Sequence, residues 1–301
     1  MIAQKYLSPR AWAELLLLSC LWGASFVSIR IALDEVPVAW VVAHRVFWAA
    51  AILWAVVALG RLPLPKGRGT LGAFVVMGLL NNILPFSLMA WGQLHIETGL
   101  TSILNATTAI FGVLVASAVF ADERLTARRA LGVALGFLGV ATAIGLDSLA
   151  QFDIRSLAQL AVLGGTFSYA LAGAWARRTL QGLNPVVAAA GMLSASALIM
   201  VPAAWTLDGP PRPDLAPRTF IAIGYYAVMA TALAYLLYYR VLAMAGAGNL
   251  MLCTLMIPPV AITLGALILG EALHPTAYLG FAILGTGLLI LNTRARRRVA
   301  A

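Results

Sequence analysis

Charged residues are scarce in this sequence. Only 10% of its 301 residues are charged and 62% are hydrophobic, whereas globular domains carry about 25% charged residues. So few charges cannot cover the surface of a water-soluble protein of this size. The composition therefore excludes a large soluble domain and predicts a chain that lies mostly in lipid.

Cysteine and histidine are also rare. The two cysteines, Cys20 and Cys253, lie in separate apolar runs, which excludes a dense disulfide framework. The three histidines are scattered and form no H-E-x-x-H pattern, so the sequence offers no metal set for a membrane-embedded hydrolase. We expect neither a metal nor another cofactor.

Long apolar runs take up almost the whole chain. A helix needs about 20 apolar residues to cross the hydrocarbon core, and the alternation typical of a β-barrel is missing. The expected fold is an all-α membrane protein with ten transmembrane helices. They are predicted at 11–32, 38–59, 71–92, 99–120, 127–145, 156–176, 185–207, 219–241, 248–269 and 276–293.

The net charge of +9 would suggest nucleic-acid binding in a soluble protein, but here the basic residues lie in the loops. Alternate loops hold fourteen Lys and Arg on one side and four on the other, with two more inside helices. The positive-inside rule then places both termini in the cytoplasm of a bacterial inner membrane. The expected partners are lipid and a small molecule, with no nucleic acid, and the oligomeric state stays open.

The two halves of the chain share a motif. The pattern E-x-L-x5-L-G-x-A-x4-G begins at Glu123 and again at Glu271, so that Gly132 corresponds to Gly280 at an offset of 148. We expect a first five-helix repeat at 1–148 and a second at 149–301. An odd number of spans inverts the second copy in the membrane, which is the build of alternating-access carriers.

With this motif the chain resembles the EamA group of the drug/metabolite transporter superfamily. The resemblance covers essentially the whole chain and rests on Trp22-Gly23, Arg45, Pro258, and the paired Glu and Gly of the repeats. Within that group the chain is similar to YddG-type exporters of aromatic and other neutral amino acids. One departure is Ile110, which stands where the first repeat would carry the counterpart of Pro258, so we expect the helix at 99–120 to bend less than that at 248–269.

Several polar and aromatic residues lie near the middle of their predicted spans, at a depth where lipid contact is costly. Their helices resemble those that line the central cavity in this superfamily. The cavity candidates are Trp22, Asn81, Asn82, Tyr169, Thr231, Tyr235 and Pro258. Trp22 and Tyr169 correspond at an offset of 147, and we expect them to face each other. Interhelical hydrogen bonding is the alternative role for both asparagines.

The charged residues allow more than one role. Arg45, after His44, could attract a substrate carboxylate, or it could serve structure or gating. Glu14 is expected to form an exposed pair with Arg10, and Glu123 and Glu271 to complement helix N-termini.

The expected function is export of small metabolites, chiefly aromatic and other neutral amino acids, by alternating access at a central cavity between the repeats. One alternative is a multidrug carrier of the same superfamily, for which Glu14 is the candidate carboxylate inside a span. The other is a membrane-embedded enzyme, against which the scattered histidines count.

The topology is testable by cysteine labelling. A single cysteine placed between Arg61 and Gly69 should react with a membrane-impermeant reagent only after the cytoplasmic face is opened, because this basic loop is expected inside. Labelling in intact spheroplasts would show that the orientation is wrong.

Overall fold

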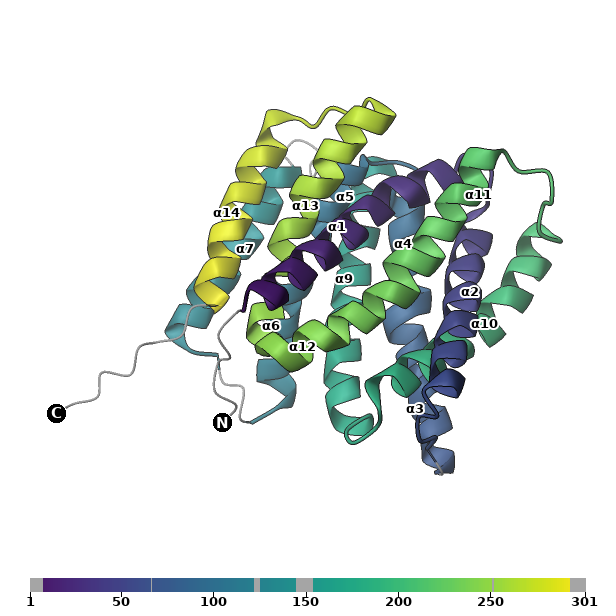
Figure 1. The fold of residues 1–301 in the computed structure, drawn as a ribbon. Coiled ribbons are helices and arrows are strands. Elements are labelled where there is room, and N and C mark those ends of the chain that lie inside the picture. The colour runs from purple at the N-terminus through teal and green to yellow at the C-terminus, as the bar shows by residue number, and fades with distance from the viewer. Residues whose placement is uncertain (1–7, 66, 122–124, 145–153, 251, 293–301) are drawn as a thin grey trace.

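The predicted apolar runs form helices in the computed structural model, which describes residues 8–65, 67–121, 125–144, 154–250 and 252–292 (Figure 1). In chain order these are α1 (Pro9–Ala32), α2 (Val38–Leu59), α3 (Arg68–Gly78), η1 (Leu79–Ile83), α4 (Leu84–Gly92), α5 (Thr98–Asn105), α6 (Thr108–Val119), α7 (Ala127–Ile144), α9 (Ile154–Thr179), α10 (Pro185–Asp208), α11 (Pro217–Gly224), η2 (Tyr225–Leu233), α12 (Ala234–Leu250), α13 (Cys253–Leu264), η3 (Gly265–Leu269) and α14 (Pro275–Asn292). The η segments are π-helical turns that continue the neighbouring helices.

Among the described residues, eight helical stretches are long and apolar enough to cross a membrane. Two shorter apolar helices follow them, Cys253–Leu269 and Pro275–Leu291. The all-α membrane fold is therefore confirmed for the described residues, and the count of ten spans stays a prediction.

One helical stretch is interrupted where the sequence has no proline. The stretch predicted at 99–120 is interrupted after Asn105, although it carries Ile110 and no proline. The hydroxyls of Thr107 and Thr108 donate to the carbonyls of Leu104 and Asn105 at 2.7 and 2.8 Å, which competes with the helical ladder. Threonine hydroxyls thus accompany a break without proline, and the smaller bend expected here than at 248–269 stays a prediction.

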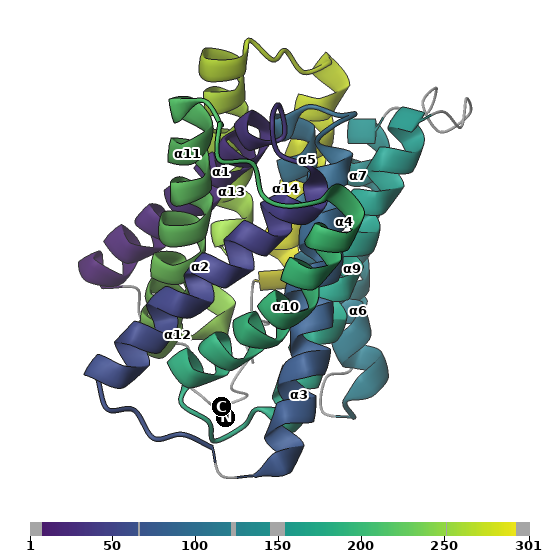
Figure 2. The ribbon, with the colours of Figure 1, turned by 90° about the vertical axis from the view of Figure 1, so that its right-hand side faces the viewer.

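The helices pack in pairs that correspond between the halves of the chain. The pairs α7 with α14 and α2 with α10 each join one helix from either half (Figures 1 and 2). The pair α1 with α13 has its counterpart in α9 with α5 and α6. Likewise, α1 lies against the long helix made by α11, η2 and α12, and α9 lies against α4. The main contacts are therefore preserved when the first five predicted spans are exchanged with the last five.

Glycines bring α7 and α14 into direct backbone contact. A Cβ atom built on Gly139 would lie 2.7 Å from the carbonyl oxygen of Gly280, and one built on Gly132 would lie 2.9 Å from that of Gly287. In the motif, Gly132 corresponds to Gly280 and Gly139 to Gly287. Gly139 thus meets the counterpart of Gly132, and Gly132 meets the counterpart of Gly139. Such reciprocal contacts are those that a two-fold axis produces. The order of these contacts along the chain also shows that the two helices are antiparallel.

Two carboxylates cap helices that belong to the other half of the chain. Glu271 accepts hydrogen bonds from the backbone N–H and hydroxyl of Thr98, at the start of α5, at 2.9 and 2.5 Å. Glu35 accepts from the Ala216 N–H and the Thr219 hydroxyl, at the start of α11, at 2.9 and 2.7 Å. Glu271 complements a helix N-terminus as expected, but that of α5 and not that of α14, which follows it. Glu123 lies outside the described residues.

The α7–α14 contact predicts that Gly280→Ala destabilises the protein. The added Cβ would lie 2.5 Å from the Gly139 carbonyl oxygen, and overpacking of this kind costs about 1–3 kcal/mol. Gly285→Ala on the same helix is the matched control, because its nearest neighbour would lie 3.7 Å away. Thermal unfolding in detergent should show a lower midpoint for Gly280→Ala only. An unchanged midpoint in Gly280→Ala would contradict the close contact.

Glu35 predicts a pH dependence. The hydrogen bonds from the Thr219 hydroxyl and the Ala216 N–H, with Arg218 and Arg212 nearby, lower the pKa of Glu35 below its ordinary value. A carboxyl whose pKa is lowered by folding stabilises the fold above its ordinary pKa, and this contribution is lost as the pH falls through the lowered pKa. The difference in unfolding midpoint between wild type and Glu35→Gln should therefore be largest near neutral pH and shrink below about pH 4. A difference that stays constant down to about pH 3 would argue against the cap.

Candidate functional site

Two π-helical segments, η1 and η2, interrupt the long helices near their middle. Such segments are frequent at functional sites. In the first, Pro85 lacks the N–H that would bond the carbonyl of Asn81, which favours a widened turn. In the second, the Thr231 hydroxyl donates to the Tyr226 carbonyl at 2.7 Å. Each segment presents polar side chains to the interior of the bundle.

Side chains from other helices bond carbonyls of both π-helical segments. The indole Nε1 of Trp22 on α1 donates to the carbonyl of Ala230 in η2 at 3.1 Å. The hydroxyl of Ser168 on α9 donates to the carbonyl of Leu80 in η1 at 2.7 Å. Ser168 directly precedes Tyr169, the expected counterpart of Trp22. The two hydrogen bonds therefore occupy similar places in the two halves of the chain.

The two asparagines join η1 to α10 and α12. Asn82 is fully buried and donates to the Ser196 hydroxyl at 3.0 Å. Asn81 is half-buried and donates to the Tyr235 hydroxyl at 2.9 Å. The structure therefore brings Asn81, Asn82 and Tyr235 together, with Asn82 held between helices and Asn81 on the more open side.

Arg45 of α2 lies in the same region. Its Nε donates to the Thr231 hydroxyl at 2.9 Å, and its guanidinium carbon lies 3.9 Å from the centre of the Phe86 ring. Phe86 in turn meets Tyr169 edge to face, with ring centres 6.5 Å apart. Tyr235 is within electrostatic range of both Arg45 and Tyr169. We call the group the central cluster; it comprises Arg45, Asn81, Asn82, Phe86, Tyr169, Thr231 and Tyr235.

The other predicted site residues lie outside the central cluster. The Trp22 ring packs against Tyr238 at 5.9 Å, whereas the ring beside Tyr169 is Phe86. Pro258 is buried in α13, which packs chiefly on α1 and α5. His44 contacts Trp40 and borders a small hollow beside the 33–37 and 209–215 loops. Each predicted role of these residues stays a prediction.

Glu14 differs from its expected place. It is 9% exposed, and besides Arg10 at 3.2 Å it pairs with Arg240 on α12 at 2.5 Å. The expected pair with Arg10 is therefore confirmed, but the expectation that Glu14 is exposed was wrong. Sequence spacing within α1 could not reveal the second arginine.

The sequence prediction missed Phe86, Tyr226 and Ser196. Phe86 and Tyr226 lie in apolar runs in which many aromatic residues occur, so neither stands out. Ser196 sits on α10 among small residues and is fully buried. Only Pro85, directly before Phe86, marks the η1 segment in the sequence.

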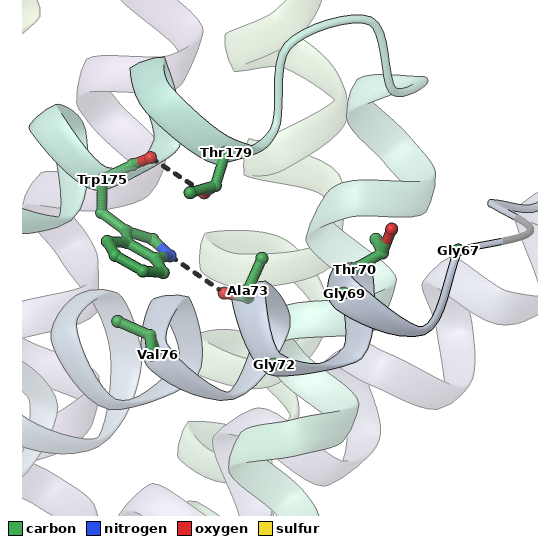
Figure 3. A pocket seen from close by; sticks show the side chains of 8 residues that line it. All are labelled: Gly67, Gly69, Thr70, Gly72, Ala73, Val76, Trp175 and Thr179. Atoms are coloured by element: carbon green, nitrogen blue, oxygen red, sulfur yellow. Dashed lines mark hydrogen bonds between the residues drawn. The ribbon is translucent and has the colours of Figure 1, made fainter.

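A hollow of about 640 Å³ lies elsewhere, between α3 and α9 (Figure 3). Gly67, Gly69 and Gly72 leave it open, and Trp175 closes one side by donating from Nε1 to the Ala73 carbonyl at 3.2 Å. None of the predicted site residues lines this hollow. In the part of the chain that the structure describes, no three His, Cys, Asp or Glu residues gather as a metal site.

A family model decides the relationship of this chain to known proteins. The model of the EamA-like transporter family matches residues 11–145 and again residues 156–293. The chain belongs to this family. It is therefore a multi-pass membrane protein that transports a small molecule and not an enzyme, and the resemblance inferred from its motifs is confirmed.

Relatives of this EamA-like transporter cover almost its full length. A probable terminal-alkyne amino-acid exporter of Streptantibioticus cattleyicolor is 28% identical over 98% of both chains. A probable amino-acid metabolite efflux pump of Escherichia coli is 26% identical over 91% of this chain and 92% of that one. A solved crystal structure matches 93% of this chain and 96% of that chain, with a TM-score of 0.64 at 17% identity, which shows a shared fold.

Proposed function

We propose that this EamA-like transporter exports small metabolites, chiefly aromatic and other neutral amino acids, across a bacterial inner membrane. The observation that carries the proposal is the central cluster, in which polar and aromatic side chains from α2, α4, α9, α12 and the two π-helical segments meet inside the bundle. Aromatic faces and hydroxyl groups suit an amphiphilic substrate. The names of two relatives, an amino-acid exporter and an amino-acid metabolite efflux pump, support this class.

The proposed architecture is ten spans in two inverted repeats, 1–148 and 149–301, with both termini in the cytoplasm. Two family matches on either side of this boundary support it. The reciprocal glycine contacts of α7 and α14 support the inverted relation, since a two-fold axis produces that pairing. Alternating access then consists of rocking the repeats around a substrate held near the axis.

A multidrug carrier of the same superfamily is the second candidate. It would need a carboxylate for cationic drugs, and Glu14 is the one that the sequence places inside a span. In the structure, however, this carboxylate is occupied by Arg10 and Arg240. Two cations around one carboxylate disfavour a third, so export of zwitterionic or anionic metabolites fits better.

The proposal predicts that Tyr169→Ala lowers the transport of aromatic amino acids severalfold, and the predicted cavity role of Trp22, which lies outside the central cluster, extends this expectation to Trp22→Ala. A lost aromatic contact costs about 0.5–1.5 kcal/mol beyond area burial, and small neutral substrates should lose less because they gain less from stacking. The measurement is uptake of labelled phenylalanine and alanine into proteoliposomes, with and without a pH gradient. Trp205→Ala is the control, because Trp205 is 55% exposed on α10. Transport equal to wild type in both variants, at equal protein levels, would remove these two residues from the site.

A further inference from the structure

Arg45 differs from five arginines of the bundle that form ion pairs in the structure. Arg10 and Arg240 share Glu14, Arg30 and Arg218 share Asp34, and Arg155 pairs with Glu97. In each of these pairs an acid neutralises the arginine. For Arg45, which lies about 10 Å along α2, the described residues provide no acidic partner.

Only one nitrogen of the Arg45 guanidinium forms a hydrogen bond with the described residues. The Thr231 hydroxyl accepts a hydrogen bond from the Arg45 Nε at 2.9 Å. The Phe86 ring covers one face of the guanidinium, with its centre 3.9 Å from the guanidinium carbon. The two terminal nitrogens of Arg45 form no hydrogen bond within the described part of the chain. Arg45 is also only half-buried. A guanidinium that is oriented at Nε and open at its fork is the geometry that binds a carboxylate with two parallel hydrogen bonds.

The neighbourhood of Arg45 supplies a further donor. Tyr226 is fully buried, its hydroxyl has no hydrogen-bond partner among the described residues, and it lies within electrostatic range of Arg45. A buried hydroxyl without a partner costs free energy, and an oxyanion at Arg45 would provide the acceptor that it lacks. The hydroxyls of Tyr169 and Tyr235 also lie within that range.

The central cluster offers an ammonium group fewer favourable contacts than it offers a carboxylate. The hydrogen bonds and ring contacts of the central cluster are made by amide, hydroxyl, guanidinium and aromatic groups, and none of its members is acidic. A positive ligand would also meet the charge of Arg45. The electrostatics therefore favour one end of an amino acid over the other.

We propose that Arg45, assisted by the Tyr226 hydroxyl, binds the carboxylate of the transported molecule, and that the carboxylate is the group that the transporter requires. The inference rests on the proposed function in taking the central cluster as the substrate site. It extends the substrate class to aromatic carboxylates without an amino group, such as 2-oxo and 2-hydroxy acids. It excludes the amides and amines of the same side chains.

Transport in proteoliposomes tests the inference with labelled phenylalanine and labelled phenylpyruvate as separate substrates. Unlabelled phenylpyruvate and 3-phenyllactate should compete with either label about as well as phenylalanine does, whereas phenylalaninamide should compete at least about tenfold less. Arg45→Gln should lower transport of both labels at least about tenfold. Arg30→Gln is the control arginine, because its partner Asp34 lies at the end of α1, outside the cluster.

Two milder variants keep the test decisive if Arg45→Gln does not fold. Arg45→Lys keeps the charge but loses the fork, and Tyr226→Phe removes only the hydroxyl, so each should weaken competition by the acids severalfold. Thermal unfolding of the purified variants measures folding separately. Wild-type competition by the acids in both folded variants would overturn the proposal.

The outcomes separate this inference from the proposed function. If phenylalanine is transported and phenylalaninamide competes as well as the acids do, the carboxylate inference fails while amino-acid export stands. If phenylpyruvate alone is transported and Arg45→Gln abolishes it, the inference stands while amino-acid export fails. If neither label is transported and neither acid raises the unfolding midpoint of the purified protein, both are wrong.

Discussion

Inside a membrane, a backbone carbonyl that loses its helical partner must find another donor within the protein. The π-helical segments η1 and η2 place this demand in the middle of two long helices. The donors come from other helices, Trp22 on α1 and Ser168 on α9. These bonds fix how α1 and α9 lie against the interrupted helices. The central cluster depends on that arrangement, because Asn81 and Thr231 extend from the same two segments.

Much of the fold follows from the sequence because a helix that crosses lipid must be long and apolar. Helix α2 occupies the predicted range 38–59 without change. The π-helical segments could not be predicted in the same way, because an apolar run has the same composition whether its turns are α or π. Only Pro85 signals η1, and in η2 the hydroxyl of Thr231 acts through a contact that spacing does not reveal.

The site was predictable where a residue is costly in lipid. Asn81, Asn82 and Thr231 had to face protein or water at their depth, and they do meet other helices. Aromatic residues carry no such signal, so Phe86 was missed. Correspondence between the halves predicts where along its helix a residue lies, but not which residue it contacts. The ring beside Trp22 is therefore Tyr238, which the correspondence did not indicate.

The glycine contact of α7 and α14 restricts how the sequence of this transporter can diverge. Gly139 leaves no room for a side chain on Gly280, and Gly132 leaves none on Gly287. The clash would be with the backbone of the facing residue, which is glycine already, so no substitution across the contact could relieve it. One contact therefore holds both motif copies to glycine at these four positions.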